Sequence, residues 1–245
     1  MTKIGIIGGS GLDDPKLLKY YEEVTMTTKY GNPSSPIVTG TIKDVEVAIL
    51  ARHGRGHTIH PSGVNYRANI WALKEIDCTH ILATTAVGSL REEIKPGDLV
   101  FPDQFIDFTK KRENTFFDEQ KVVHTPMGDP FSETMRNLLI DSAKKLGFRH
   151  HPTGTLVTIE GPRFSTKAES NMFRMLGADV INMSTVPEVV LSRELDMEYA
   201  TVAMSTDYDC WKENEEHVTF EIILKIMKQN ADNVKKLIVE TIPKI

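Results

Sequence analysis

Short apolar runs bounded by glycine and polar residues alternate along the chain with longer segments whose apolar positions have helical spacing. The apolar runs predict buried strands at residues 4–7, 45–50, 81–85, 155–159, 179–183 and 199–203. Helical spacing and capping residues predict helices over residues 65–76, 133–146, 167–175, from Pro187 onward, and from 219 to about 242. Strands alternating with helices are typical of a mixed, mostly parallel central sheet flanked by helices on both faces. Nothing marks a boundary, so we predict a single α/β domain over residues 1–245.

The composition and net charge of the chain argue against some classes of binding partner. The chain has 245 residues, of which 40% are hydrophobic and 26% charged, as in ordinary globular proteins. Its net charge of −5 gives no support for nucleic acid or an anionic membrane as the main partner. No apolar run is long enough to cross a bilayer, and the strand predicted at residues 4–7 leaves no room for a signal peptide. The two cysteines form no disulfide framework. We therefore expect a cytoplasmic protein.

Polar side chains follow several of the predicted strands. Parallel sheets bind ligands at the carboxyl ends of their strands, so these residues are expected to form one site. The residues at these strand ends are Ser10, Arg52, His53, Thr85, Ala86, Met183, Ser184, Asp207 and Asp209, all polar except Ala86 and Met183.

The glycine-rich stretch at residues 8–11 invites a dinucleotide-binding interpretation. That fingerprint needs a third glycine at the position of Asp14, and Pro15 follows directly. The alternative is a loop that wraps an oxyanion with backbone N–H groups and the Ser10 hydroxyl.

Arginine and hydroxyl groups at the other strand ends fit the same anion. Arg52 offers a planar fork of donors suited to phosphate oxygens, and Thr85 and Ser184 add hydroxyl donors. The spacing of His57 and His60 could suggest metal ligands, but loop residues are the simpler interpretation. We predict a phosphate dianion bound as a co-substrate, with no metal and no cofactor.

Asp207 and Asp209 stand two residues apart after a buried strand, so their side chains should project to the same face. Neighbouring carboxylates raise one another's pKa, which lets one stay protonated and act as a general acid. A turn or half of a metal site is the alternative for this pattern alone. The anion-binding residues elsewhere favour a nucleoside site.

Several long segments carry a resemblance to a known family. They are IGIIGGSGLDD (4–14), ARHGRGHTIHPS (51–62), NYRANIWALKEIDCTHILATTAVGSLREEIKPGD (65–98), TIEGPRFSTKAES (158–170), ADVINMSTVPEVVL (178–191), STDYDCWKENEE (205–216) and the closing TIPKI. With these segments, nearly the whole chain resembles the trimeric purine nucleoside phosphorylase family, and within it the branch that cleaves methylthioadenosine.

The resemblance implies cleavage of a purine nucleoside by inorganic phosphate, with release of the base and a ribose 1-phosphate. It assigns phosphate binding to Ser10, Arg52, His53, Thr85, Ala86 and Ser184. It places Met183 against the ribose, Phe164 on the base, Ser165 and Phe220 along the base and 5′ regions, Leu224 near the 5′ substituent and His57 toward the 5′ side. It also implies a homotrimer in which His124 reaches into a neighbouring subunit's site.

The acidic pair gives an expectation about the base. Asp207 is expected to protonate purine N7, and family members that prefer 6-oxopurines carry asparagine at its position. Two carboxyl groups therefore favour a 6-aminopurine, and S-methyl-5′-thioadenosine is the expected nucleoside. Many relatives continue beyond the position of Ile245, so discrimination against a 5′-hydroxyl is expected to be looser, unless the Phe220 ring supplies the missing apolar surface.

Three other functions compete with this one. The first is a broader nucleoside phosphorylase that uses adenosine or 6-oxopurine nucleosides such as methylthioinosine. The second is a hydrolase, which Arg52 and the hydroxyl donors argue against. The third is a purine-binding protein without activity, which is disfavoured because every chemical position holds a competent residue.

Overall fold

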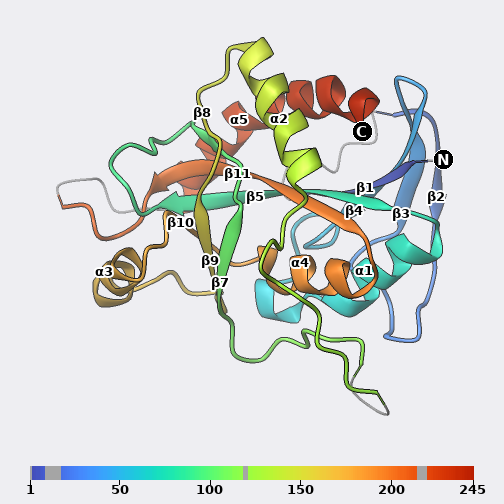
Figure 1. The fold of residues 1–245 in the computed structure, drawn as a ribbon, viewed down its shortest axis with the longest axis horizontal. Helices are drawn as coiled ribbons and strands as arrows, with labels where there is room; N and C mark the ends of the chain where they lie inside the picture. The colour runs from blue at the N-terminus through green and yellow to red at the C-terminus, as the bar shows by residue number, and fades with distance from the viewer. Residues whose placement is uncertain (1, 9–17, 118–120, 214–219) are drawn as a thin grey trace.

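The predicted apolar runs lie at the centre of a large twisted sheet in the computed structural model (Figure 1). The structure describes residues 2–8, 18–117, 121–213 and 220–245, with the backbone alone at 220–225 and 227–229. The strands within these ranges are β1 (Lys3–Gly8), β2 (Lys19–Val24), β3 (Ile37–Ile42), β4 (Val45–Ala51), β5 (His80–Ser89), β6 (Leu99–Val100), β7 (Gln104–Phe108), β8 (His150–His151), β9 (Thr155–Ile159), β10 (Val180–Asn182) and β11 (Glu198–Tyr208). The helices are α1 (Tyr66–Glu75), α2 (Glu133–Leu146), α3 (Lys167–Met175), α4 (Thr185–Glu194) and α5 (Phe220–Thr241), with short 3₁₀ turns at Pro61–Gly63 and Ile242–Lys244.

The sheet is mixed and mostly parallel, as predicted. Its strand order is β2-β3-β4-β1-β5-β10-β9-β7, and β11 pairs with both β5 and β6. The pairs β1–β4, β1–β5, β5–β11, β9–β10 and β7–β9 are parallel. The pairs β2–β3, β3–β4, β5–β10 and β6–β11 are antiparallel. Strand β5 is the centre of this arrangement because it pairs with β1, β10 and β11.

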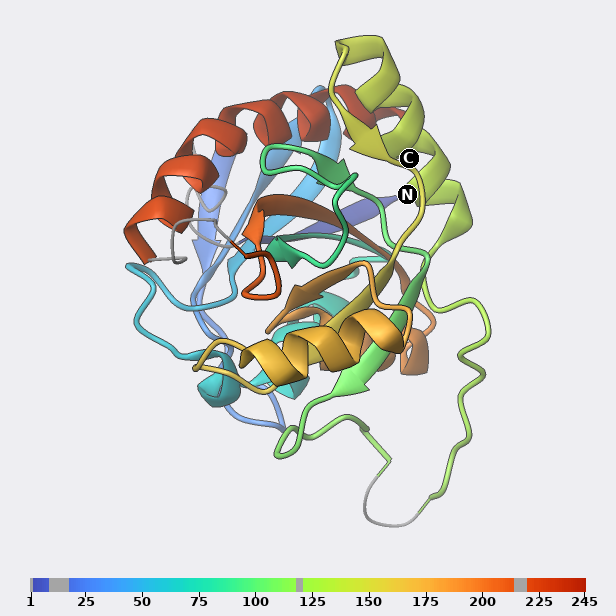
Figure 2. The same cartoon turned by 90° about the vertical axis from the view of Figure 1, so that its left-hand side faces the viewer.

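Helices cover both faces of the sheet, which confirms the predicted layers (Figures 1 and 2). On one face, Leu139 of α2 and Leu237 of α5 pack in a core cluster with sheet residues such as Val202. On the other face, Leu73 of α1 and Val189 of α4 belong to a second cluster. All five side chains are fully buried.

Local sequence signals set the helix ends. The Ser132 side chain accepts a hydrogen bond from the Met135 N–H at the start of α2, and Gly147 ends this helix with φ of 70°. Thr166 and Glu169 form a reciprocal capping box at the start of α3. In α4 Val186 has non-helical dihedral angles, so regular helix geometry begins at Pro187, as predicted. The side chains of Ser132, Thr166 and Glu169 satisfy backbone N–H groups that a helix start would otherwise leave unpaired.

The predicted apolar stripe of α5 is confirmed where the structure describes it. Val234, Leu237 and Ile238 are fully buried. The side chains of Ile223 and Met227, which continue the predicted stripe, lie outside the described part.

Some strands were not predicted, and β5 and β11 extend several residues beyond their predicted ends. The side chains of β2 are mostly exposed, so this edge strand carries no apolar signal. Strands β5 and β11 continue past the predicted runs, so Thr85, Ala86 and Asp207 lie inside strands rather than in the loops that follow them. These extensions contain polar residues of the site, so a search for apolar runs does not detect them as strand.

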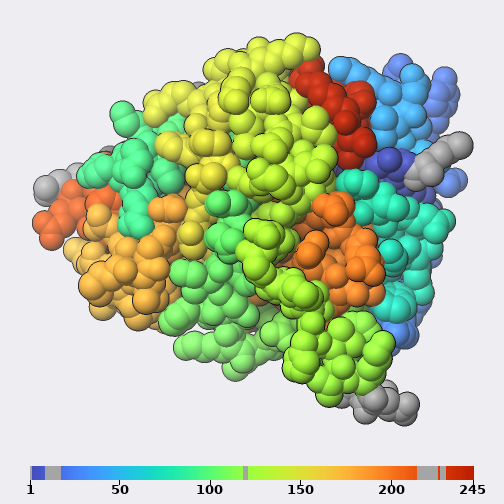
Figure 3. Space-filling model, in the orientation of Figure 1, coloured from blue at the N-terminus to red at the C-terminus, as the bar shows by residue number. Residues whose placement is uncertain are grey.

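An irregular stretch, described at residues 109–117 and 121–130, lies between β7 and α2 and extends from the body of the molecule (Figure 2). In Figure 3 its residues form a lobe at the lower edge of the surface. At its root, the Phe116 N–H donates to Glu194 Oε2 at 2.7 Å, and Arg112 Nη1 donates to the Val186 carbonyl at 2.6 Å. Farther out, Val122 is 80% exposed and His124 is also exposed. We call residues 109–117 and 121–130 the arm.

Candidate functional site

The site lies where strand pairing along one edge of β5 is interrupted. Residues 80–83 of β5 pair with β1, and residues 88–89 pair with β10. Residues 84–87 lie between these two partners, and we call this stretch the sheet gap. The opposite edge of β5 pairs with β11 along nearly its full length. The gap therefore opens inside the sheet, between its two halves.

A cavity of about 430 Å³ opens at the sheet gap. It is lined by most of the predicted site residues: Arg52, His53, His57, Thr85, Ala86, Phe164, Ser165, Met183, Ser184, Asp207 and Asp209. The expectation that residues distant in sequence gather in one place is thus met for this set.

The remaining predicted residues are placed differently. His124 does not line this cavity and stands on the exposed arm. Ser10 and the side chains of Phe220 and Leu224 lie outside the described residues.

Arg52 comes directly after the buried strand β4, and it is 1% exposed. Its Nε and Nη2 donate to the two carboxylate oxygens of Glu188 at 2.5 and 3.0 Å, and Nη1 donates to the Thr84 carbonyl at 2.9 Å. Burial lowers the pKa of Arg52, but the charge and hydrogen bonds of Glu188 outweigh this effect and raise it above its ordinary value. A guanidinium has five N–H groups, so two remain for a ligand after these three contacts.

Glu188 was not predicted as a site residue. It is fully buried at the start of α4, and the Tyr199 hydroxyl donates to its Oε2 at 3.0 Å. A buried carboxylate is rare unless it is paired. Its sequence signal was a single acidic residue inside the otherwise apolar run of residues 186–191.

His53 is held as a neutral ring. Its Nδ1 lies 2.9 Å from the Ile59 carbonyl, and a carbonyl can only accept, so Nδ1 carries the proton. Burial, followed by the positive charge of Arg52, lowers the pKa of His53 to about 4. At pH 7 its Nε2 is therefore a proton acceptor. The His57 ring stacks against it, with centroids 4.5 Å apart.

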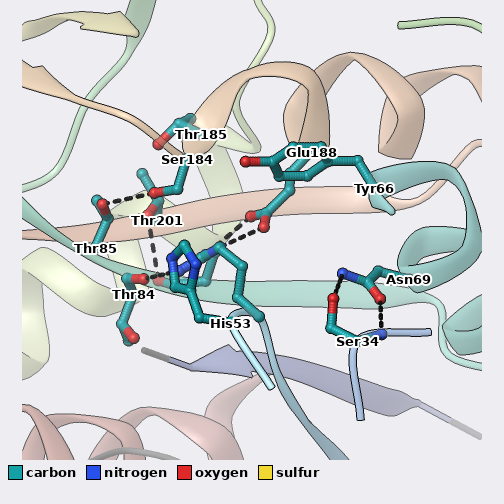
Figure 4. A network of polar contacts seen from close by, with 12 residues as sticks. Ser34, His53, Tyr66, Asn69, Thr84, Thr85, Ser184, Thr185, Glu188 and Thr201 are labelled. Carbon is teal, nitrogen blue, oxygen red and sulfur yellow. Dashed lines mark hydrogen bonds and ion pairs between the residues drawn. The ribbon is translucent and has the colours of Figure 1, made fainter. Parts of the chain in front are cut away.

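Hydroxyl groups meet beside the arginine. Thr85 Oγ1 and Ser184 Oγ lie 2.9 Å apart (Figure 4). The amide of Asn182 contacts both, and Asn182 also lines the cavity although it was not predicted. Backbone groups of residues i and i+2 face the same strand edge, and the Thr84 carbonyl faces Arg52, so the Ala86 N–H also faces the sheet gap. These donors, together with Arg52, suit an anion.

The paired carboxyl groups stand at another part of the cavity. A register shift in β11 between Ser205 and Asp207 leaves Asp207 opposite Gly88. A Cβ atom at Gly88 would lie 3.3 Å from Asp207 Oδ2 and 3.4 Å from Asp209 Cβ, so both acids flank this glycine. The Ser165 hydroxyl contacts both oxygens of Asp209, at 2.8 and 2.6 Å.

Asp207 is chemically suited to proton transfer. It accepts a hydrogen bond from Thr206 Oγ1 at 2.6 Å. Burial, with a smaller contribution from the charge of Asp209, raises the pKa of Asp207 to about 6. A carboxyl group with this pKa exists in both protonation states near neutral pH. The cavity thus combines one end whose donors suit an anion with a carboxyl group suited to donate a proton.

Within the described residues, no group of three or more His, Cys, Asp or Glu side chains is placed to hold a metal ion. In the same part of the chain, no helix has the length and apolar character needed to span a bilayer.

Known proteins resemble this chain in sequence and in fold. The profile of the Phosphorylase superfamily matches residues 3–243, and the chain belongs to this family. Within it, the chain is 57% identical to S-methyl-5'-thioadenosine phosphorylase of Danio rerio, over all of this chain and 89% of the relative. It is 53% identical to the enzyme of the same name from Anopheles gambiae, again over all of this chain and 89% of the relative.

Solved structures agree with these relatives. The methylthioadenosine phosphorylase of Schistosoma mansoni in complex with adenine matches with a TM-score of 0.95 and 44% identity, over 99% of this chain and 91% of the other. An adenosine/methylthioadenosine phosphorylase variant from the same organism, in complex with methylthioadenosine, matches with a TM-score of 0.94 and 43% identity, over 99% and 91%.

Proposed function

We propose that the protein catalyses the phosphorolysis of S-methyl-5′-thioadenosine to adenine and 5-methylthioribose 1-phosphate. The observation that carries this proposal is a single cavity holding both the donors around Arg52 and the buried Asp207–Asp209 pair. Relatives at 52–57% identity bear the name of this activity. The enzyme is thus a pentosyltransferase of the phosphorylase family.

The anion end of the cavity suits the attacking phosphate. Glu188 holds the Arg52 guanidinium in place, so its remaining N–H groups are oriented before the ligand arrives. Hydrogen bonds to charged groups are worth about 1.5–3 kcal/mol each. Phosphate held beneath C1′ stabilises the positive charge that grows on the ribose as the glycosidic bond breaks, and then attacks it. No cofactor is required in this scheme.

The acidic end suits the departing adenine. Negative charge develops on the purine, and protonation at N7 by Asp207 relieves it. The raised pKa of Asp207 keeps part of the population protonated near pH 7. The neighbouring carboxylate accepts from a 6-amino group, whereas a 6-oxo group would leave it unpaired. Leaving a buried polar group unpaired costs about 1–3 kcal/mol, so this pair favours adenine.

The proposal includes a homotrimer in the cytoplasm. The arm is fixed at its root by Glu194 and Arg112, while its outer residues are exposed. Such an arm is suited to carry His124 to the 5′ side of a neighbouring subunit's cavity.

The test compares methylthioadenosine, methylthioinosine, adenosine and inosine, each with and without phosphate, by chromatography of the free base and the sugar phosphate. We expect methylthioadenosine to be the best substrate, with cleavage that requires phosphate. Arg52→Ala, as the matched variant, should raise the KM for phosphate at least about tenfold. Full-rate cleavage without phosphate would show a hydrolase. Equal use of inosine would favour the broader nucleoside phosphorylase.

A further inference from the structure

We propose that Asn182 is a positioning residue that fixes the direction of the hydrogen bonds among Thr85, Ser184 and Thr185, so that a hydroxyl proton points at the phosphate. This inference rests on the proposed function, because it assigns the anion to the cavity beside these groups. Asn182 ends β10 at the sheet gap and is 5% exposed. Thr85 and Ser184 are each 5% exposed, and Thr185 is 1% exposed.

The contacts determine which way the Asn182 amide faces. The Ser184 N–H lies 3.4 Å from Oδ1 of Asn182, and a backbone N–H can only donate. The atom that it faces must therefore be the amide oxygen. The Thr158 hydroxyl donates to the same oxygen at 2.8 Å. The amide nitrogen then points to the hydroxyl groups.

The two protons of that nitrogen have defined acceptors. Nδ2 lies 3.1 Å from Thr85 Oγ1 and 2.7 Å from Thr185 Oγ1, whereas Ser184 Oγ is farther away at 3.5 Å. Because Nδ2 can only donate, both threonine oxygens act as acceptors toward it. Neither threonine proton can point at Asn182.

A proton is consequently directed away from Asn182. If Thr85 donates to Ser184 across their 2.9 Å contact, the Ser184 proton is left for the anion. If Ser184 donates to Thr85, the Thr85 proton is directed to the Ala86 carbonyl, 3.2 Å from Thr85 Oγ1, or to the ligand. The first arrangement therefore presents one O–H donor to a ligand, and in the second the ligand competes with the Ala86 carbonyl for the proton. The direction of these hydrogen bonds, and not only their presence, decides whether the hydroxyl pair can donate to an anion.

The substitution Asn182→Asp would reverse the direction of these hydrogen bonds at nearly constant side-chain size. The new carboxylate can only accept, so Thr85 and Thr185 would turn their protons toward it. Ser184 would then donate to Thr85, and the pair would present only oxygen lone pairs. The new negative charge would also repel phosphate. Asn182→Asp is therefore a sharper test than a truncation.

The experiment measures the KM for phosphate, the KM for methylthioadenosine and kcat of the wild-type and variant enzymes from pH 5.5 to pH 8. At pH 8 we expect Asn182→Asp to raise the KM for phosphate at least about 100-fold, because charge-assisted hydrogen bonds are lost. Its affinity for adenine, titrated by calorimetry without phosphate, should change less than about threefold. As the pH falls, the ratio of variant to wild-type KM for phosphate should shrink, because a protonated carboxyl group is uncharged and can donate.

Two further variants complete the test. Thr158→Val removes a contact on the oxygen side of the amide alone, and we expect it to raise the KM for phosphate less than about threefold. Asn182→Ala keeps the experiment decisive if the aspartate variant does not fold. It frees the hydroxyl groups to rotate and should raise the KM for phosphate about tenfold, with adenine affinity unchanged.

The outcomes separate the inference from the proposed function. Wild-type cleavage that does not need phosphate overturns the proposed function and this inference with it. Phosphate-dependent wild-type cleavage overturns the inference alone if Asn182→Asp keeps its KM for phosphate within about threefold of wild type. A loss that affects phosphate and adenine equally and does not vary with pH also overturns it, because that pattern describes a merely structural residue.

Discussion

Replacing Asp207 by asparagine is expected to stabilise the folded protein at neutral and alkaline pH while removing most of its activity. Asp207 is buried beside Asp209, and burial raises its pKa from the ordinary 3.8 to about 6. A raised pKa means that the fold disfavours the ionised form of this carboxyl group. The amide is uncharged at every pH, and its oxygen still accepts from Thr206 Oγ1. The variant thus loses an unfavourable charge and keeps the hydrogen bond.

The magnitude follows from the two pKa values. One pKa unit corresponds to about 1.4 kcal/mol, so a rise from 3.8 to about 6 corresponds to about 3 kcal/mol. The stability that a protonated Asp207 provides is fully present below pH 3.8 and is lost as the pH rises through about 6. The advantage of Asp207→Asn should therefore be about 3 kcal/mol at pH 8 and fall below about 1 kcal/mol near pH 4.

The assay is urea unfolding of both proteins from pH 4 to pH 8 at one protein concentration, with turnover of methylthioadenosine measured in parallel. Turnover of Asp207→Asn should fall about 100-fold or more, the usual scale for loss of a general acid. Asp141→Asn, on the exposed side of α2, is the matched control and should change stability by less than about 0.5 kcal/mol. A variant that is less stable than wild type at pH 8, or a difference that does not depend on pH, would refute the reasoning.

Three further predictions concern the surroundings of the site. Glu188→Ala leaves the buried Arg52 charge unpaired and should lower the free energy of unfolding by about 3–5 kcal/mol; a loss below about 1 kcal/mol in urea titration would contradict this. Gly88→Ala places a Cβ atom 3.3 Å from Asp207 Oδ2, so adenine affinity in calorimetry should fall about tenfold while the KM for phosphate stays constant; an unchanged adenine affinity would count against the placement of the base. His124→Ala should keep the KM for phosphate and raise the KM for methylthioadenosine more than that for adenosine, and equal changes would argue against a role at the 5′ side.

Sequence patterns identified the elements whose signals are local. Ser132 and Gly147 mark the ends of α2 because capping depends on a few neighbouring residues. The buried strands β1 and β4 are visible as apolar runs for a similar reason. Strand β2 was missed because its pairing with β3, and not burial of its own side chains, holds it in place.

The site likewise contains some residues that the sequence identifies and others that only the tertiary structure reveals. Arg52 and Asp207 could be identified because their residue types and positions after apolar runs suggest chemistry. Glu188 could not be assigned a role, since its partner Arg52 is 136 residues away and only the tertiary fold brings the two together. Asn182 was missed because its proposed positioning role depends on which way its amide faces, and this is set by its neighbours in space. Predicting such residues requires knowledge of the sheet gap itself.

The sheet gap has a mechanical consequence. Strand β5 pairs with β1 at one end and with β10 at the other, so along that edge it alone joins the two halves of the sheet. A substrate bound over residues 84–87, as proposed, would contact both halves and restrain their relative motion. Filling the site should therefore damp the relative motion of the halves, and slowed amide hydrogen exchange in β1 and β10 would report it. Catalysis and the stiffness of the whole sheet then share one structural element.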